Sequence, residues 1–486
     1  MQNYKSLSRR SLLQAAGTAF AAGIPFRALA ADHQASPLIS TLSAYMAEAA
    51  RRPLPEPVIE KTKHIILDTL AAMISGSELP PGKFILNFAR LYQGAGVSTV
   101  VASKILTGPI DAAMCNGMLA HSDETDDTHP PSQSHPGASI VPSALAVGER
   151  FGVDGTRWLR SVALGYDVGP RVTITLGKLQ YMVDTHRSTH AISGTFGSAA
   201  AAACAAGLNA QQMRWVLSYT AQQASGLASW QRDTDHIEKA FDFAGMAARN
   251  GVTAALLVQA GGTGVDDILS GADNFLAAFA PKNSAELLVE KLGERYEVTR
   301  TNFKKWTVGA PIQAPLDAME TVLRANRLEP DRVKQIVVRV ATDEATIVDN
   351  REISDICLQH LVAVMLVDGT VTFKSAHDAA RMKDPAVLRQ RAKVRLVKDE
   401  ELERLMPKRV AIVELTLTDG KTLTERVEAV RGTVENPMTR DEVVAKARDL
   451  IAPVLGSTGT TKLIERILEL EKVKDVRELR PLLQKS

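Results

Sequence analysis

The segment from His121 to Gly137 concentrates residues that could do chemistry. Within seventeen positions it holds four acids and three of the ten histidines, namely Asp123, Glu124, Asp126, Asp127, His121, His129 and His135. Carboxylates and imidazoles together can transfer protons near neutral pH or bind zinc or manganese. They can also cap backbone groups of a loop. No His-x₃-His or His-Glu-x-x-His spacing occurs here, which argues against a metal, while proton transfer and a structural loop both stay open.

Two predicted helices flank this segment, so a loop would aim its side chains into a cleft. Apolar residues recur at helical spacing over 58–76 and over seven further segments that Gly or Pro separates. Those segments are 80–93, 109–121, 138–150, 155–170, 193–206, 209–226 and 245–260. The pattern predicts helical structure from 37 to 292, and it becomes helical again over 439–482.

One of these helices is made almost entirely of small residues. Gly194-Thr-Phe-Gly-Ser precedes eight residues that are all Ala or Cys. A helix with such short side chains can pack closely on every side. We therefore expect it in the interior of the protein or at a dimer interface.

Short β-branched runs appear after residue 300. They occupy 336–340, 393–397, 411–417 and 422–427, and Asp419-Gly420 between the last two predicts a hairpin. Helical stretches at 313–326, 353–367 and 374–381 interleave with them. We predict a mainly α protein: a large all-α domain over 37–300 and 433–486, with a smaller α+β lid domain inserted at 301–432. A cleft between two such domains would take a small ligand.

The composition favours a soluble globular enzyme. Of 486 residues, 45% are apolar and 23% charged, and the net charge is only +2. A nucleic-acid binder that depends on a basic surface is therefore not expected, nor is a stable membrane anchor. Three scattered cysteines are too few for a disulfide framework or a zinc cluster, so we expect buried thiols.

Residues 1–30 are typical of a signal peptide. Arg9-Arg10 precedes a short Ala- and Gly-rich apolar stretch that ends in Ala28-Leu-Ala30. Paired arginines in this position resemble the twin-arginine signal that bacteria use to export folded proteins. Removal of the segment would change the net charge from +2 to −2, and we predict a periplasmic protein that has passed through the twin-arginine machinery.

Several motifs, in the same order, resemble those of the MmgE/PrpD family, which contains 2-methylcitrate dehydratase and cis-aconitate decarboxylase. They lie at 67–71, 112–121, 126–129, 135–138, 165–171, 194–200, 245–251 and 432–438. The resemblance covers nearly the whole mature chain. It implies a helical domain with an α+β lid, a homodimer, and no metal or organic cofactor. The chemistry it implies is proton abstraction next to a carboxylate of a di- or tricarboxylic acid, with loss of water or carbon dioxide.

The resemblance assigns the catalytic residues to the acidic segment and to one helix start. His135 matches the histidine before Pro-Gly and is our first choice for the general acid or base. Thr128 matches a threonine whose hydroxyl would donate to substrate, and Glu124 stands where the family commonly has an aspartate. His190 is the nearest match to a histidine before the Gly-Thr-Phe-Gly helix, with His186 second, although both fall out of register.

Two lysines would bind substrate carboxylates. Lys239 lies six residues before Gly245, where the family spacing is five, and Lys304 has Lys305 as a competitor. Asp127 is a further candidate for substrate binding, although a loop brace is the more natural role for it. The mechanism requires His135 and Lys304 to converge on one interdomain gap.

Three positions depart from the family pattern. Gly309 and Gln313 stand where relatives often carry histidines, and Val348 stands where decarboxylase members have a tyrosine. Each missing proton-transfer group is worth roughly 10²–10⁴-fold in rate. These three substitutions weigh strongly against cis-aconitate decarboxylation, and more weakly against dehydration of 2-methylcitrate. We predict a cofactor-independent, dehydratase-like lyase acting on a small polycarboxylate; the alternatives are an isomerase or epimerase, or a catalytically silent periplasmic binding protein.

Overall fold

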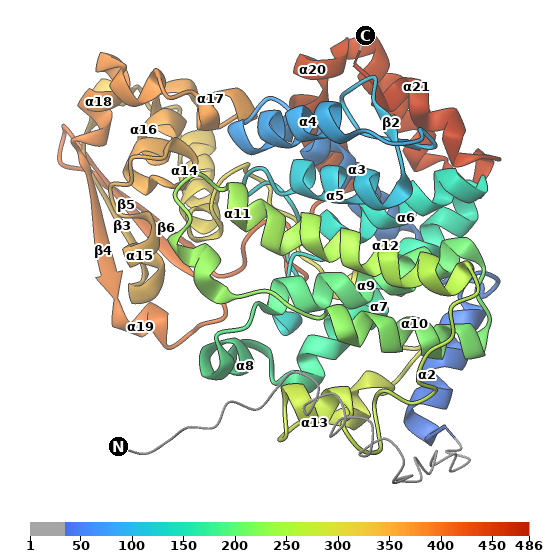
Figure 1. The fold of residues 1–486 in the computed structure, drawn as a ribbon. Coiled ribbons are helices and arrows are strands. Elements are labelled where there is room, and N and C mark those ends of the chain that lie inside the picture. Colours follow the sequence, from blue (N-terminus) through green and yellow to red (C-terminus); the bar gives the residue numbers. More distant parts are fainter. Residues whose placement is uncertain (1–34, 486) are drawn as a thin grey trace, which may run out of the picture. The chain divides into compact units, whose positions relative to one another are not determined.

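Helices dominate the structure, a computed structural model that describes residues 35–485 (Figure 1). The predicted signal peptide, residues 1–30, lies outside the described residues. Residues Ser36–Ser486 form one unit by their internal contacts. Within the described part of the chain, no helix combines the length and apolar character that a bilayer crossing requires.

The predicted helices before residue 300 all form, with ends shifted by a few residues. Proline begins several of them, and the side chains of Ser188 and Asn209 cap two others. With four helices that were not predicted individually (α2, α8, α11 and α13), the helices of this region are α2 (Pro37–Glu48), α3 (Glu56–Gly76), α4 (Pro80–Tyr92), α5 (Pro109–Ala120), α6 (Gly137–Phe151), α7 (Gly155–Leu176), α8 (Lys178–Thr185), α9 (Thr189–Ala206), α10 (Ala210–Gln223), α11 (Ile237–Ala240), α12 (Met246–Gln259) and α13 (Phe275–Phe279).

The small-residue helix α9 lies in the interior, against α7 on one side and α12 on the other (Figure 1). Glycine permits this close packing. A Cβ atom at Gly169 of α7 would lie 2.3 Å from the carbonyl oxygen of Ser193, and one at Gly251 of α12 would lie 2.5 Å from the amide nitrogen of Ala199. His190 lies in the first turn of α9, and its ring is 5.3 Å from that of His135. The packing of α9 therefore also positions a histidine beside the acidic segment.

A four-stranded mixed sheet follows residue 330. Its strands are β3 (Val333–Ala341), β4 (Val394–Asp399), β5 (Ala411–Leu417) and β6 (Thr422–Val427), in the order β4-β3-β5-β6. β3 is parallel to β4 and antiparallel to β5, and the predicted hairpin joins β5 to β6. Burial alternates along β5, as a sheet with one packed face requires.

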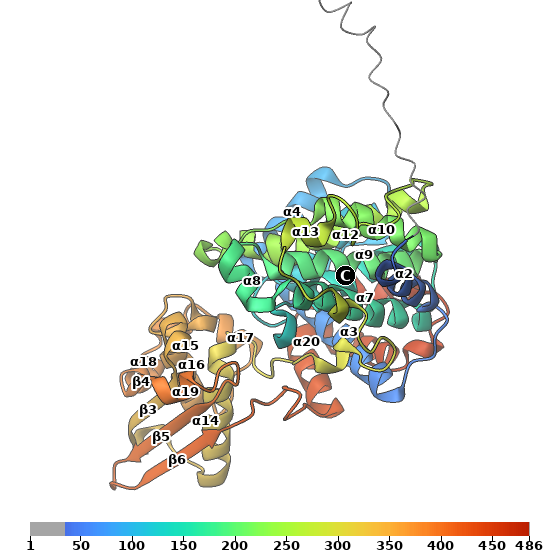
Figure 2. The same ribbon diagram turned by 90° about the horizontal axis from the view of Figure 1, so that it is seen from below.

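Helices cover this sheet and return the chain to the first helices. They are α14 (Gln313–Asn326), α15 (Thr342–Val348), α16 (Leu358–Asp368), α17 (Phe373–His377), α18 (Pro385–Arg391), α19 (Glu400–Glu403), α20 (Arg440–Leu468) and α21 (Arg480–Leu483). α14 packs on β5 and β6, and α16 packs on β4. Figure 2 shows α14 to α19 gathered with the strands, and α20 beside α3.

Buried apolar residues form separate clusters. One draws on residues 58–303 and 438–483, and another on residues 306–430. The chain passes from the first cluster to the second between Phe303 and Trp306, and returns between Val430 and Met438. The predicted domain bounds at 301 and 432, and a lid that moves as its own domain, stay predictions. One expectation needs correction: the first region is not purely helical. Short strands β1 (Ser98–Thr99) and β2 (Leu106–Thr107) pair there, and residues after Gln259 form mostly turns and 3₁₀ segments up to residue 300.

Candidate functional site

Residues 121–136, the acidic loop, connect α5 to α6 and are held by buried polar contacts. Lys446 of α20 donates to the carbonyl oxygen of Thr125 at 2.9 Å and pairs with Asp68 of α3 at 2.7 Å. Asp127 accepts hydrogen bonds from the Tyr166 hydroxyl at 2.5 Å and from the amide of Gly137 at 3.0 Å. Buried, satisfied networks of this kind fix a loop in one conformation.

One carboxylate in the loop joins two histidines. Nδ1 of His121 lies 3.0 Å from Oδ2 of Asp126, and Nδ1 of His135 lies 3.2 Å from Oδ1. His121 and Asp126 are fully buried, whereas the side chain of His135 keeps 12% exposure. An imidazole nitrogen that faces a carboxylate carries the proton, so in a neutral ring held this way Nε2 keeps its lone pair.

A second carboxylate joins the two predicted lysines. Glu124 pairs through Oε1 with Lys239, and its Oε2 lies 3.3 Å from Nζ of Lys304. Although burial alone would raise the pKa of Glu124, these ammonium groups hold it well below its usual range. Nζ of Lys304 also lies 3.9 Å from Oδ1 of Asp126, the oxygen that His135 contacts. His135 and Lys304 therefore approach the same oxygen of Asp126, while the interdomain gap between them stays a prediction.

A π-helical turn explains the spacing before Gly245. Phe241–Gly245 is π-helical and lies between α11 and α12. Such a turn holds more residues than an α-helical turn, and these turns are frequent at functional sites. With this turn between Lys239 and Gly245, Lys239 reaches Glu124.

The same π turn places Phe243 among the aromatic rings of the site. Its ring stacks on His190 with centroids 3.7 Å apart and on His121 at 4.6 Å, and Trp230 meets it edge-on at 4.6 Å. The ring of His236 lies 5.1 Å from that of His121. The site therefore combines this group of aromatic and imidazole rings with two lysines and two carboxylates.

Burial keeps three histidines of the site, His135, His190 and His236, uncharged near neutral pH. Burial, together with the charge of Lys304, lowers the pKa of His135 to about 4 against the opposing effect of Asp126. The pKa of His236 falls to about 3 because of burial and Lys239, and burial holds the pKa of His190 well below its usual range. Neutral imidazoles can accept protons, so the geometry suits a general base beside an anion-binding lysine pair.

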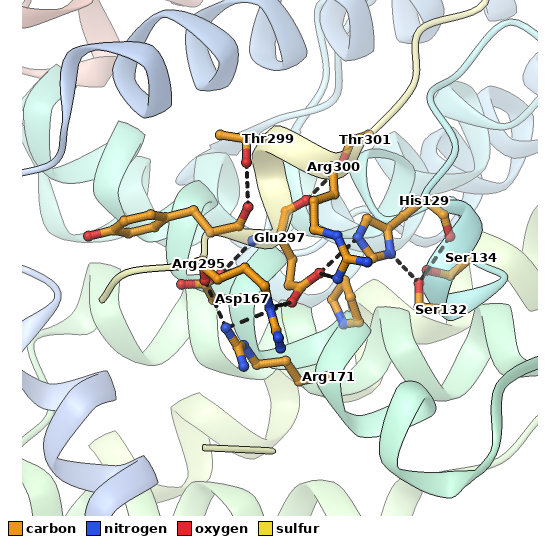
Figure 3. Close-up of polar contacts among 12 residues, drawn as sticks. His129, Ser132, Ser134, Asp167, Arg171, Arg295, Glu297, Thr299, Arg300 and Thr301 are labelled. Carbon is orange, nitrogen blue, oxygen red and sulfur yellow. Dashed lines mark hydrogen bonds and ion pairs between the residues drawn. The ribbon is translucent and has the colours of Figure 1, made fainter. Parts of the chain in front are cut away.

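His129 of the acidic loop belongs to a separate buried ion network, shown in Figure 3. Its Nε2 lies 3.2 Å from Glu297, which also faces Arg171 at 3.7 Å, Arg295 at 2.9 Å and Arg300 at 2.8 Å. Burial would raise the pKa of Glu297, but His129 and the arginines lower it to about 2. These contacts give His129 a structural role in holding the loop.

A third ion pair joins the loop to α17. Nε2 of His377 lies 3.0 Å from Asp123 and 3.7 Å from Asp355. Burial opposes the charged form, yet the two carboxylates raise the pKa of His377 to about 9. The cation at His377 therefore links the sheet-containing region to the residue that precedes Glu124.

Two residue sets have the spacing that a metal ion needs. Ligand atoms of His121, Asp126 and His135 lie within 4.8 Å of one another, as do those of His121, Glu124 and His236. The ammonium groups of Lys239 and Lys304 already neutralise Glu124, and a divalent cation there would face both of them. Because like charges repel, the arrangement suits an incoming anion better than a cation.

The structure separates the remaining predicted residues. Thr128 exchanges two backbone hydrogen bonds with Asn302, which ties the loop to the segment of Lys304, but none of the described ion pairs or ring contacts includes it. Both oxygens of Asp127 are engaged by Tyr166 and Gly137, so its placement is that of a brace and not of a substrate ligand. His186 is exposed at the end of α8, whereas His190 lies in the site.

Sequence reasoning assigned no role in the site to His121, His236 or Phe243. The first two stand in charged segments where solvated histidines are common, and Phe243 has the pattern of a core residue. The available signals were that His121 begins the acidic segment and that His236 lies three residues before Lys239. Neither signal reveals that both rings approach one another.

The three positions that depart from the family pattern have structural roles here. The amide of Gln313 bonds to both backbone groups of Trp306, at 3.1 and 2.7 Å. Gly309 donates its amide to the carbonyl of Asp355, and Val348 is fully buried in the cluster around the sheet. None of these three positions supplies an imidazole, and the histidines of the site, His121, His135, His190 and His236, all precede residue 300.

The chain is similar to known proteins over almost its whole length. The family model for the MmgE/PrpD N-terminal domain matches residues 40–288, and that for the MmgE/PrpD C-terminal domain matches residues 306–471. The chain is 27% identical over 454 residues to a Homo sapiens protein named cis-aconitate decarboxylase, covering 89% of this chain and 91% of the relative. It is 25% identical over 470 residues to a protein of the same name from Aspergillus terreus, covering 88% and 92%.

Proposed function

Because this chain belongs to the MmgE/PrpD family, we propose that it is a lyase that removes a proton next to a carboxylate of a small di- or tricarboxylic acid. The reaction would need no metal or organic cofactor. The observation that supports this best is the meeting of His135 and Lys304 at one oxygen of Asp126, with Glu124 and Lys239 beside them. A neutral imidazole is thereby set next to two ammonium groups.

Each group has a defined task in this proposal. A substrate carboxylate takes the place that Glu124 now holds between Lys239 and Lys304. His135 accepts the proton at Nε2, and the electron pair of the broken C–H bond moves into the substrate carboxylate. In the loss of water, this electron pair then forms the C=C bond, the C–O bond breaks, and the hydroxide leaves as water with the proton that His135 returns. The ammonium groups stabilise the negative charge that builds up there, which is where electrostatic catalysis has its largest effect.

The leaving group distinguishes two candidate reactions. We favour a dehydratase-like loss of water over decarboxylation, because Val348 stands where decarboxylase members of the family have a tyrosine, and Gly309 and Gln313 stand where relatives often carry histidines. The names of the curated relatives favour the second candidate, loss of carbon dioxide. Export by the twin-arginine route and a homodimer belong to the same proposal; the first rests on residues 1–30 and the second on the family resemblance.

Replacement of His135 by alanine is expected to abolish most of the activity. The full chain would be incubated in D₂O with citrate, 2-methylcitrate and cis-aconitate, and proton NMR would follow deuterium exchange, water loss and decarboxylation. His135→Ala should slow exchange at least about 100-fold, because it removes the base. His186→Ala is the matched control and should exchange like the parent, since His186 is exposed and outside the site.

Exchange at the parental rate in His135→Ala would contradict the role of this residue. Tight binding of these acids by the parent protein without exchange would support the silent binding protein instead. Exchange without loss of water or carbon dioxide would support the isomerase or epimerase.

The pH dependence of kcat/KM gives a second test of the base. The pKa of His135 is about 4, so its neutral form is present above that pH and is lost as the pH falls through it. Since kcat/KM reports the ionisation of the free enzyme, we expect an acidic midpoint near pH 4, with folding checked by circular dichroism at each pH. A midpoint near 6.5, the usual value for a histidine, would show that the base is solvated or is another group.

A further inference from the structure

Asp126 differs from the neighbouring acids of the loop in what it contacts. Asp123 accepts the amide of Thr125, and Asp127 accepts that of Gly137, so both hold the backbone. The described contacts of Asp126 are all with side chains of the site: His121, His135 and Lys304. A fully buried carboxylate that contacts only functional side chains is poorly explained as a loop brace.

The geometry of these contacts decides the tautomers. Each oxygen of Asp126 meets one Nδ1, at 3.0 Å for His121 and 3.2 Å for His135, and the two rings meet edge-on with centroids 5.1 Å apart. An ionised carboxylate only accepts hydrogen bonds, so both Nδ1 atoms must donate. Nε2 of His121 is buried with no hydrogen-bond partner among the described atoms, and Nε2 of His135 belongs to a partly exposed ring.

We propose that Asp126 is a positioning residue that holds His121 and His135 as a pair of Nδ1–H tautomers and so presents Nε2 of His135 to the substrate. The inference rests on the proposed function and identifies what prepares its base. When His135 takes the proton, the C–H bond breaks, an N–H bond forms at Nε2 and the electron pair stays on the substrate. The positive charge on the imidazole then faces Asp126, which remains ionised as in other carboxylate–histidine pairs.

His135 is surrounded by other titratable groups that contribute to its pH dependence. Those that approach it are His121, Asp126, His190 and Lys304, from the acidic loop, α9 and the segment before α14. Glu124 of the loop pairs with this Lys304 and with Lys239 of α11. Among the effects on the pKa of His135, Asp126 raises it, while burial and Lys304 lower it. Loss of Asp126 would therefore make His135 a weaker base.

Asp126→Asn is the decisive variant. An amide offers one acceptor oxygen and one donor nitrogen, so it cannot accept from both imidazoles, and one ring must change its tautomer. We expect kcat to fall about 100-fold with KM changed less than about threefold, and the acidic midpoint of kcat/KM to move below that of the parent. Asp126→Glu, which keeps the charge, should recover part of kcat.

Asp123→Asn is the matched control. It removes the same charge from the same loop, but Asp123 contacts His377 and Thr125 and not the imidazoles of the site. It should keep kcat within a few-fold of the parent. A loss of kcat as large as that of Asp126→Asn would show that loop charge or loop folding matters, and would overturn the positioning role.

Nitrogen NMR of histidines tests the same inference without any substrate. In the full chain labelled with ¹⁵N-histidine, His121 and His135 should give the signals of Nδ1–H tautomers, assigned by their loss in His121→Gln and His135→Gln. In Asp126→Asn at least one of them should change. Nε2–H signals for His135 in the parent would overturn the proposal. Nδ1–H signals in a parent protein that exchanges no polycarboxylate proton would uphold the positioning and reject the proposed function alone.

Discussion

Replacing Glu297 by alanine is expected to lower the free energy of unfolding by about 3–5 kcal/mol, the usual cost of removing one partner from a buried ion pair. Glu297 is fully buried and faces three arginines and His129 (Figure 3). Without it, the fully buried guanidinium of Arg171 keeps its carbonyl partners but loses its counter-charge. Urea unfolding of the full chain would measure the change.

The acidic side of the stability curve should depend on the same residue. The pKa of Glu297 is about 2 in the folded chain and ordinarily 4.5, so its stabilising effect is complete above pH 4.5 and disappears as the pH falls towards 2. The variant should lose this part of the pH dependence. Glu290→Gln serves as the control, because Glu290 pairs with Arg295 at the surface, where ion pairs contribute little. Equal destabilisation by both variants would contradict the assignment.

Replacing Lys304 by methionine is expected to lower kcat/KM by about 30- to 5,000-fold, which corresponds to roughly 2–5 kcal/mol for the loss of one buried charge partner. The side chain of Lys304 is only 4% exposed and lies between Glu124 and Asp126. Without its ammonium group, two carboxylates face the incoming substrate with Lys239 alone. Methionine keeps the length and apolar volume of the chain, so the loss reports the charge.

Lys305→Met provides the matched control for this measurement. The neighbouring lysine pairs with Glu320 of α14 and has no described contact with Glu124. Its loss should leave kcat/KM within a few-fold of the parent. A larger effect at Lys305 than at Lys304 would show that the wrong lysine has been placed in the site, which is the ambiguity that the adjacent pair created in the sequence.

Local patterns predicted the elements well because short-range preferences govern them. Helical periodicity and Gly or Pro punctuation located α3 to α7, α9, α10 and α12, and Asp419-Gly420 located the β5–β6 hairpin. The patterns failed where no periodicity exists, as in the turns after α12 and the β1–β2 pair. Those segments depend on contacts with distant parts of the chain.

The assignment of individual site residues was less complete. His135, Glu124, Lys304 and Lys239 do meet, whereas the described contacts of Thr128 are backbone bonds and those of Asp127 brace the loop, so their contact with substrate stays a prediction. Residue type suggested a hydroxyl donor at Thr128 and a substrate-binding acid at Asp127. The direction in which a side chain points depends on the neighbours that its loop meets, and a linear spacing does not contain that information.

The sequence by itself determined the family, the helical elements and the types of group available for chemistry, because those follow from local preference and from motifs carried in order along the chain. Only the tertiary structure decided that Asp126 joins His121 to His135, that a π turn keeps Lys239 in reach of Glu124, and that Phe243 stacks on the histidines. These contacts link residues from the acidic loop, α9, α11 and the π-helical turn. Their distances depend on how the small-residue helices pack, and that packing is a property of the whole core.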